Sequence, residues 1–135
     1  MPAHEVRLRP RRRLPRLLHR PHQIRSLLVL IYIAGPMTGL PDFNYPAFRA
    51  AAAELRERGF DVEDPSTNEN PTPGDYHGWL RAGLAQLIRC DAVALLDGWE
   101  ASGGARLEVN VGATLGLRVA PLSAWLADAS ERTAA

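Results

Sequence analysis

Side chains that could do chemistry gather in a polar segment over residues 97–104 and just beyond it. Ser102 stands directly before Gly103 and Gly104, a pattern that predicts a helix N-terminus whose backbone N–H groups could bind an anion such as phosphate. Glu108 follows within the same element, where proximity to a helix N-terminus favours the ionised carboxylate. The pattern fits an ordinary cap and a solvated charge equally well, so both interpretations stay open.

Apolar runs predict the strands that position this segment. Residues 27–33 are continuously apolar and rich in β-branched side chains, which suits a central parallel strand buried on both faces. Shorter runs predict strands at 60–62, 91–96 and 118–120.

Helices are expected between these strands. One covers 46–58, and a second starts after Asp75, which can cap it. Residues 105–116 alternate like a strand but also fit a helical face, and the flanking glycines favour the helix. A short helix or tail is expected over 121–129.

The alternation of strands and helices predicts the fold class. It indicates an α/β domain, a three-layer Rossmann/flavodoxin-like parallel sheet of four to five strands with helices on both faces. Ligands in such sheets bind at the carboxyl ends of the strands. The loops expected there are 34–45, 64–74 and 97–104, so function is expected in them.

Composition divides the chain into three parts. Residues 1–25 hold eight of the 16 basic residues and one acid, and we expect a basic, disordered extension there. Residues 26–122 form the predicted domain, and 123–135 a C-terminal short helix or tail. Without the extension the chain carries about −6, which offers no basic surface for nucleic acid. Binding of nucleic acid would therefore fall to the basic tail alone.

Cysteine and histidine usage excludes two further classes of protein. Cys90 is the single cysteine, so no intrachain disulfide framework is possible. No Cys/His cluster has metal-ligand spacing, and we expect neither a metal nor a cofactor. No apolar run is long enough to span a membrane. A cytoplasmic protein fits these observations.

Two blocks carry a resemblance to a known family. The first is Ile31-Tyr32-Ile33-Ala34-Gly35-Pro36-Met37-Thr38-Gly39, and the second joins residues 90–99 to Ser102-Gly103-Gly104-Ala105-Arg106-Leu107-Glu108. Together they resemble uncharacterised bacterial and phage proteins grouped with the nucleoside 2-deoxyribosyltransferases. The similarity covers about 95 residues.

The resemblance implies roles for particular residues. Deoxyribosyltransferases and the related 2′-deoxynucleoside 5′-phosphate N-hydrolases cleave an N-glycosidic bond through a covalent glycosyl-enzyme. Glu108 matches their nucleophile and Tyr32 the tyrosine that hydrogen-bonds it. Ser102, with Gly103 and Gly104, matches a 5′-phosphate contact. The loop residues expected near the sugar or phosphate are Gly35, Pro36, Met37 and Thr38.

One position departs from the family pattern. Where relatives carry an acid in the second helix, this chain has Gly83, which suggests either tight packing or a site that has lost its proton donor. Asp97 and Glu100 are the available substitutes, because a leaving base needs a general acid. Trp99 could stack on the base, although packing within the loop is the commoner role.

Three functions follow as hypotheses. The first is a hydrolase or deoxyribosyltransferase acting on a nucleoside or deoxynucleotide, and the second is a catalytically degenerate nucleotide-binding module. The third is a nucleic-acid or membrane role carried by the basic tail. The resemblance also implies a homo-oligomer.

Overall fold

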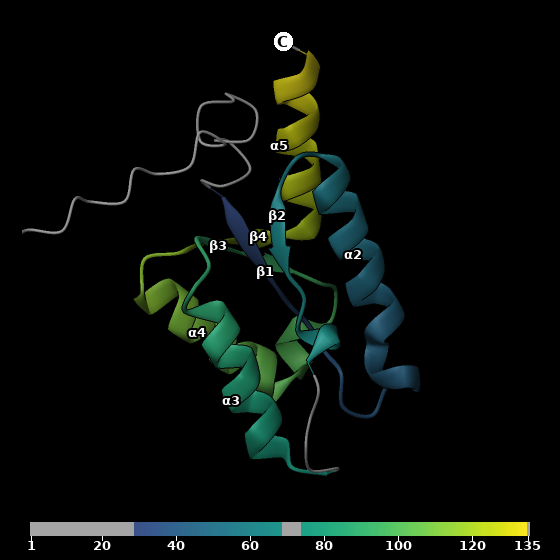
Figure 1. Ribbon diagram of the computed structural model, residues 1–135, viewed down its shortest axis with the longest axis vertical. Coiled ribbons are helices and arrows are strands. Elements are labelled where there is room, and N and C mark those ends of the chain that lie inside the picture. Colours follow the sequence, from purple (N-terminus) through teal and green to yellow (C-terminus); the bar gives the residue numbers. More distant parts are fainter. Residues whose placement is uncertain (1–28, 69–73, 135) are drawn as a thin grey trace, which may run out of the picture.

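Four parallel strands form the centre of the protein in the computed structural model (Figure 1). The structure describes residues 29–68 and 74–134, so the expected basic extension at 1–25 lies outside the described residues. The strands are β1 (Leu30–Ala34), β2 (Asp61–Glu63), β3 (Ala92–Leu95) and β4 (Arg118–Pro121). Their spatial order is β2-β1-β3-β4, with every pairing parallel. The predicted class of parallel α/β sheet is confirmed.

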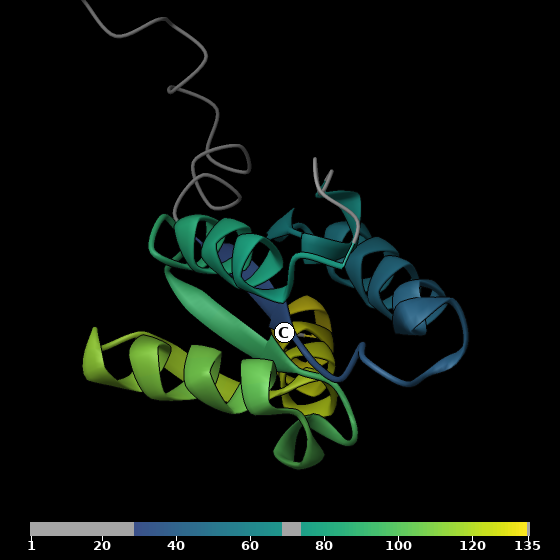
Figure 2. The same cartoon turned by 90° about the horizontal axis from the view of Figure 1, so that it is seen from below.

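Helices cover both faces of this sheet and complete the three layers. The elements α2 (Tyr45–Glu57) and α5 (Leu122–Ala134) lie on one face, and α3 (Tyr76–Leu87) and α4 (Gly103–Thr114) lie on the other (Figures 1 and 2). The helix α4 resolves the ambiguous segment 105–116 in favour of a helix. Ser102 caps it, because the Ser102 hydroxyl accepts a hydrogen bond from the Ala105 N–H at 3.2 Å.

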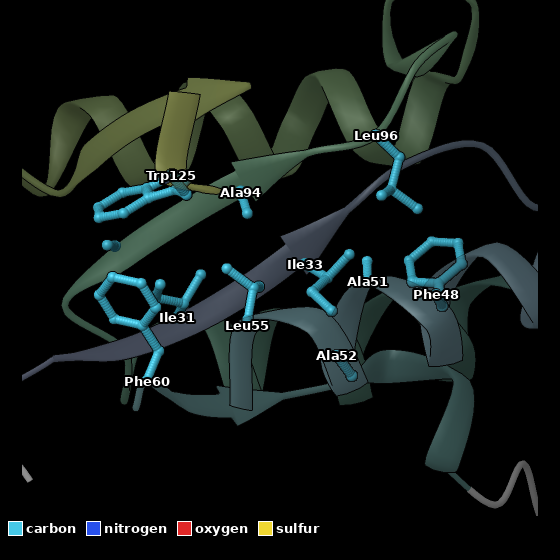
Figure 3. Close-up of a cluster of buried hydrophobic side chains, with 11 residues drawn as sticks. Ile31, Ile33, Phe48, Ala51, Ala52, Leu55, Phe60, Ala94, Leu96 and Trp125 are labelled. Atoms are coloured by element: carbon cyan, nitrogen blue, oxygen red, sulfur yellow. The ribbon is translucent and has the colours of Figure 1, made fainter. Parts of the chain in front are cut away.

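The core on the first face joins β1 to α2 and α5 (Figure 3). Ile31 and Ile33 of β1 pack against Leu55 of α2, and all three are fully buried. Trp125 of α5 is buried as well, and its indole N–H donates to the Val93 carbonyl at 3.1 Å. The C-terminal helix runs beyond the expected end at 129 and contributes to the core.

The core on the second face is where polar chemistry enters. Successive strand residues point to opposite faces, so Tyr32 and Ala34 lie against α3 and α4 while their neighbours face α2. Tyr32 packs in a cluster with Leu87 and Val93, and 1 % of its surface is exposed. The strand register thus carries a phenol group to the boundary between β1 and α3.

The strand order creates a switch point between β1 and β3. The chain leaves β1 toward β2 on one side, and leaves β3 toward β4 on the other, which opens a crevice at the carboxyl ends of the two central strands. Gly35, directly after β1, lies where a Cβ would stand 2.8 Å from the Cβ of Leu96. A glycine is needed there because any side chain would collide with the loop after β3.

Candidate active site

A cavity of about 670 Å³ opens at this switch point. It lies between the loops after β1 and β3 on one side and the N-terminal halves of α3 and α4 on the other. Nine of the residues predicted from the sequence line it: Tyr32, Gly35, Pro36, Met37, Thr38, Ser102, Gly103, Gly104 and Glu108. The fold therefore brings both sequence blocks to one concave surface.

Glu108 and Tyr32 meet inside this cavity. The Oε2 atom of Glu108 is buried and has no hydrogen-bond partner among the described residues. Burial raises the pKa of Glu108 to about 7, and hydrogen bonding by the Tyr32 hydroxyl opposes this rise. Burial also raises the pKa of Tyr32, and the negative charge of Glu108 raises it further. Tyr32 thus keeps its proton as a donor, while Glu108 changes charge near neutral pH.

Gly83 of α3 lies directly against this pair. A Cβ at Gly83 would stand 2.9 Å from the Tyr32 hydroxyl oxygen and 4.0 Å from Oε2 of Glu108. The space that an acidic side chain would need is therefore occupied by Tyr32. Of the two interpretations of this glycine, the geometry favours tight packing, and an acid placed here would first have to displace the tyrosine.

The N-terminus of α4 forms one wall of the cavity. The amides of its first turn lack partners within the helix, and Gly103 and Gly104 leave them uncovered by side chains. Nη2 of Arg106 and the hydroxyl oxygen of Tyr76 each lie 3.9 Å from the point where a Cβ on Gly103 would stand. A cation and a hydroxyl therefore stand beside amides that can donate to an anion.

Aromatic side chains that were not predicted from the sequence form a second wall of the cavity. Phe43, Tyr45 and Trp79 line the cavity, with ring centroids 5.8 Å apart for Phe43–Tyr45 and 6.5 Å for Tyr45–Trp79. Tyr76 lies nearby on α3. The sequence feature that could have indicated this wall is the presence of several aromatic residues near the starts of the helices that follow the loops at the carboxyl edge of the sheet.

An unusual turn carries Phe43 into this wall. Asp42, Phe43 and Asn44 have φ angles of 51°, 52° and 61°, in the left-handed region. Such a conformation costs about 1–2 kcal/mol for a residue with a side chain like that of phenylalanine. The Asn44 side-chain amide donates to the Pro36 carbonyl at 3.0 Å and ties the turn to the loop after β1.

Three of the predicted site residues do not reach the cavity. Asp97 and Glu100 are exposed and absent from the cavity lining. The short 3-10 helix η4 (Trp99–Ala101) turns Trp99 toward the cluster around Tyr32, where it packs against the core. Asp75 caps α3 as predicted, since its carboxylate accepts from the Gly78 N–H at 2.9 Å. Among the described lining residues, Glu108 is the one carboxyl group.

Residues 29–68 and 74–134 contain no group of three or more His, Cys, Asp or Glu side chains arranged to hold a metal ion. No helix in the same ranges is long and apolar enough to cross a membrane.

Fold and cavity together define a parallel α/β protein with a buried carboxyl–phenol pair at the switch point of its sheet. The chain matches the family model described as a domain of unknown function, DUF4406, over residues 29–121, and it belongs to that family. The match spans the whole sheet and every cavity-lining residue named above. No curated protein matches the chain.

Proposed function

We propose that the protein cleaves the N-glycosidic bond of a 2′-deoxynucleoside or its 5′-monophosphate, with Glu108 as the nucleophile. The observation that carries the proposal is the buried Oε2 atom of Glu108, unpartnered at the wall of a 670 Å³ cavity. A buried polar atom without a partner costs about 1–3 kcal/mol. Such a group in a folded protein calls for an explanation, and a catalytic role or a bound ligand supplies one.

The reaction follows from the positions of these groups. A carboxylate oxygen of Glu108 attacks C1′ of the sugar while the C1′–N bond breaks, and the electron pair of that bond leaves with the base, which takes up a proton from solvent. Water then attacks C1′, releases the carboxylate and returns a proton to solvent. In a transferase a second base attacks C1′ instead and gives up its own N–H proton to solvent. The Tyr32 hydroxyl holds the carboxyl in place. An oxocarbenium-like transition state is stabilised by such a carboxylate.

The α4 N-terminus supplies a place for a 5′-phosphate in this proposal. The amides of Gly103 and Gly104 would donate to the phosphate oxygens, and Arg106 and Tyr76 stand beside them. The aromatic wall of Phe43, Tyr45 and Trp79 lies across the same cavity. Aromatic rings of this kind stack on nucleobases, so the wall suits the base.

Release of free base tests the proposal. The protein is incubated with the four common deoxynucleosides and their 5′-monophosphates, and free base is measured by liquid chromatography. Glu108→Gln keeps the size of the side chain and should abolish release. Glu54→Gln, an exposed position on α2 remote from the cavity, is the matched control and should leave it unchanged.

A nucleotide-binding module without catalysis is the second candidate. It is favoured by one observation, that Glu108 is the one carboxyl group among the described residues lining the cavity, so no second carboxyl there can protonate the leaving base. Binding of a deoxynucleotide without base release from any substrate would support this candidate and reject the first.

Location and assembly extend the proposal. A homo-oligomer is expected from the family resemblance. A cytoplasmic location is also part of the proposal, since the single, buried thiol of Cys90 is compatible with a reducing compartment. Light scattering coupled to gel filtration measures the assembly state directly. A monomer at the concentrations used for the activity assay would remove the oligomer from the proposal.

A further inference from the structure

A chain of hydrogen bonds runs from strand β2 to the cavity. The Asn68 side-chain amide donates to Oε1 of Gln86 at 2.7 Å, and Nε2 of Gln86 donates to Oε2 of Glu63 at 3.1 Å. Arg89 donates to the other oxygen of Glu63 at 3.4 Å. Asn68 lines the cavity at the end of this chain.

The carboxylate at the far end sets the direction of every bond in the chain. An ionised carboxylate only accepts hydrogen bonds, so Gln86 must turn its NH₂ group toward Glu63. The carbonyl oxygen of Gln86 then faces Asn68, and Asn68 must answer with its own NH₂ group. Among residues 29–68 and 74–134, no group donates to the side-chain carbonyl oxygen of Asn68, which is the free end of this series of hydrogen bonds within that part of the protein.

Burial and position make this arrangement rigid and bring it close to the reacting groups. Gln86 is 7 % exposed and lies one helical turn after Gly83 on the same face of α3. Glu63 of β2 pairs with Tyr32 of β1 in the sheet register. This series of hydrogen bonds thus starts at the strand position beside Tyr32 and passes along the face of α3 that covers Tyr32.

We infer that Asn68 presents a fixed hydrogen-bond acceptor to the cavity, which selects ligands whose base edge carries an N–H donor. The inference rests on the proposed function, because it takes the ligand to be a nucleobase derivative. The donor can be an exocyclic amino group or a ring N–H, and both offer the same chemistry to a carbonyl oxygen. Asn68 is therefore a binding residue that distinguishes bases with an N–H donor at this edge from bases with an acceptor there.

Paired probes test this inference. Each of the four common deoxynucleoside 5′-monophosphates is compared with an analogue from which one base-edge N–H has been removed, and Kd is measured by calorimetry with the full-length Glu108→Gln protein, which cannot consume them. For at least one pair the natural member should bind about tenfold more tightly, equivalent to about 1.4 kcal/mol. Asn68→Ala should reduce that ratio to about twofold or less.

Two further variants identify the cause. Glu63→Gln replaces an obligatory acceptor by a group that can also donate, so the chain loses its fixed direction and the ratio should fall while Asn68 is still present. Asn110→Ala removes an exposed asparagine of α4 outside the cavity and should leave the ratio unchanged.

The outcomes separate this inference from the function on which it rests. Equal binding of both members of every pair overturns the inference and leaves the proposed function standing. A loss in Asn68→Ala that is equal for both members also overturns it, because Asn68 would then only shape the cavity. Failure of all probes to bind overturns both the inference and the proposed nucleotide site.

Discussion

Replacing Gly83 by alanine places one methyl group against the Tyr32–Glu108 pair. The new Cβ would stand 2.9 Å from the Tyr32 hydroxyl oxygen, closer than a carbon and an oxygen can pack without movement. Tyr32 is 1 % exposed and enclosed by Leu87 and Val93, so it cannot swing into solvent. Either the phenol group or α3 must therefore shift.

The free energy of unfolding responds to two opposing effects. Alanine in a helix interior is more favourable than glycine by about 1 kcal/mol, while overpacking a core costs about 1–3 kcal/mol. The net expectation for Gly83→Ala is destabilisation by about 0–2 kcal/mol. Gly112→Ala on α4 is the matched control, because its Cβ would stand 3.2 Å from a methyl group of Val93 and away from the pair.

The shift also changes the acidity of Glu108. Hydrogen bonding by Tyr32 lowers the pKa of Glu108, so a displaced hydroxyl should move that pKa upward from about 7. A rise of one unit would reduce the ionised fraction at pH 7 from about one half to about one tenth. If the carboxylate is the nucleophile, activity at pH 7 falls by a similar factor and recovers at higher pH.

Two measurements check this expectation. Urea unfolding gives the free energy for the wild-type protein, Gly83→Ala and Gly112→Ala, and carbon-13 NMR of the glutamate carboxyl groups follows the titration of Glu108. The reasoning is wrong if Gly83→Ala unfolds like the control and Glu108 titrates at its wild-type pH. That result would mean that Tyr32 does not set the protonation of the carboxyl group.

Three other changes should separate stability from binding. Glu108→Gln should unfold like wild type near pH 4.5 and be more stable than wild type by up to about 3 kcal/mol above pH 7. The reason is that the pKa of Glu108 is about 7 in the folded protein against 4.5 for the free group, so the wild-type protein loses stability as the pH rises through this window. If the melting temperatures of the two proteins change by the same amount between pH 5 and pH 8, the prediction is wrong. Phe43→Gly should raise the free energy of unfolding by up to about 1 kcal/mol, because glycine adopts the left-handed conformation without strain, and it should weaken nucleotide binding. Asp42→Gly should relieve strain in the same turn without weakening binding. Equal Kd values for the two variants by calorimetry would show that the Phe43 ring takes no part in binding. Ser102→Ala should lower the free energy of unfolding in urea by about 1 kcal/mol through loss of the helix cap. It should also weaken the binding of deoxynucleoside monophosphates more than the binding of deoxynucleosides. An equal effect on both ligands would exclude a phosphate at this helix end.

The sheet and its helices were predictable because local patterns agreed with the tertiary structure. β1 is buried on both faces, as the composition of the apolar run that contains it indicated. The segment at 105–116 was ambiguous because Val109 and Val111 alternate as in a strand. The capped glycines before it and the packing of α4 on the sheet decide for the helix.

The strand order predicted which loops meet at the site, and the family resemblance supplied the individual residues. Gly35 directly follows β1, whereas Tyr32 lies within that strand and Ser102 lies at the end of the loop between β3 and α4, and all three line the cavity. Trp99 lies in the same loop as Ser102, yet η4 turns its ring into the core. A three-residue helical turn of this kind leaves no periodic signal in the sequence.

The aromatic wall escaped prediction for a different reason. Phe43 is brought to the cavity, which Trp79 of α3 also lines, by a turn of three left-handed residues, none of them glycine. Local preference opposes that conformation, so no pattern in the sequence predicts it. The tie from Asn44 to the Pro36 carbonyl and the packing of Tyr45 on neighbouring rings hold the turn in place.

The unsatisfied carboxyl group and the strained turn both lower the stability of the fold, and both lie at the cavity. Oε2 of Glu108 lacks a partner at one end of the cavity, and Phe43 holds a disfavoured backbone conformation at another. Neither cost helps the apolar core, which is completed on the opposite face of β1 by α2 and α5. A ligand that satisfies the carboxyl and stacks on the aromatic wall would recover energy that folding leaves unused. The cavity is therefore better explained by ligand binding than by packing of the core. Which ligand it binds depends on the hydrogen-bonding groups that the ligand offers to Glu108 and Asn68.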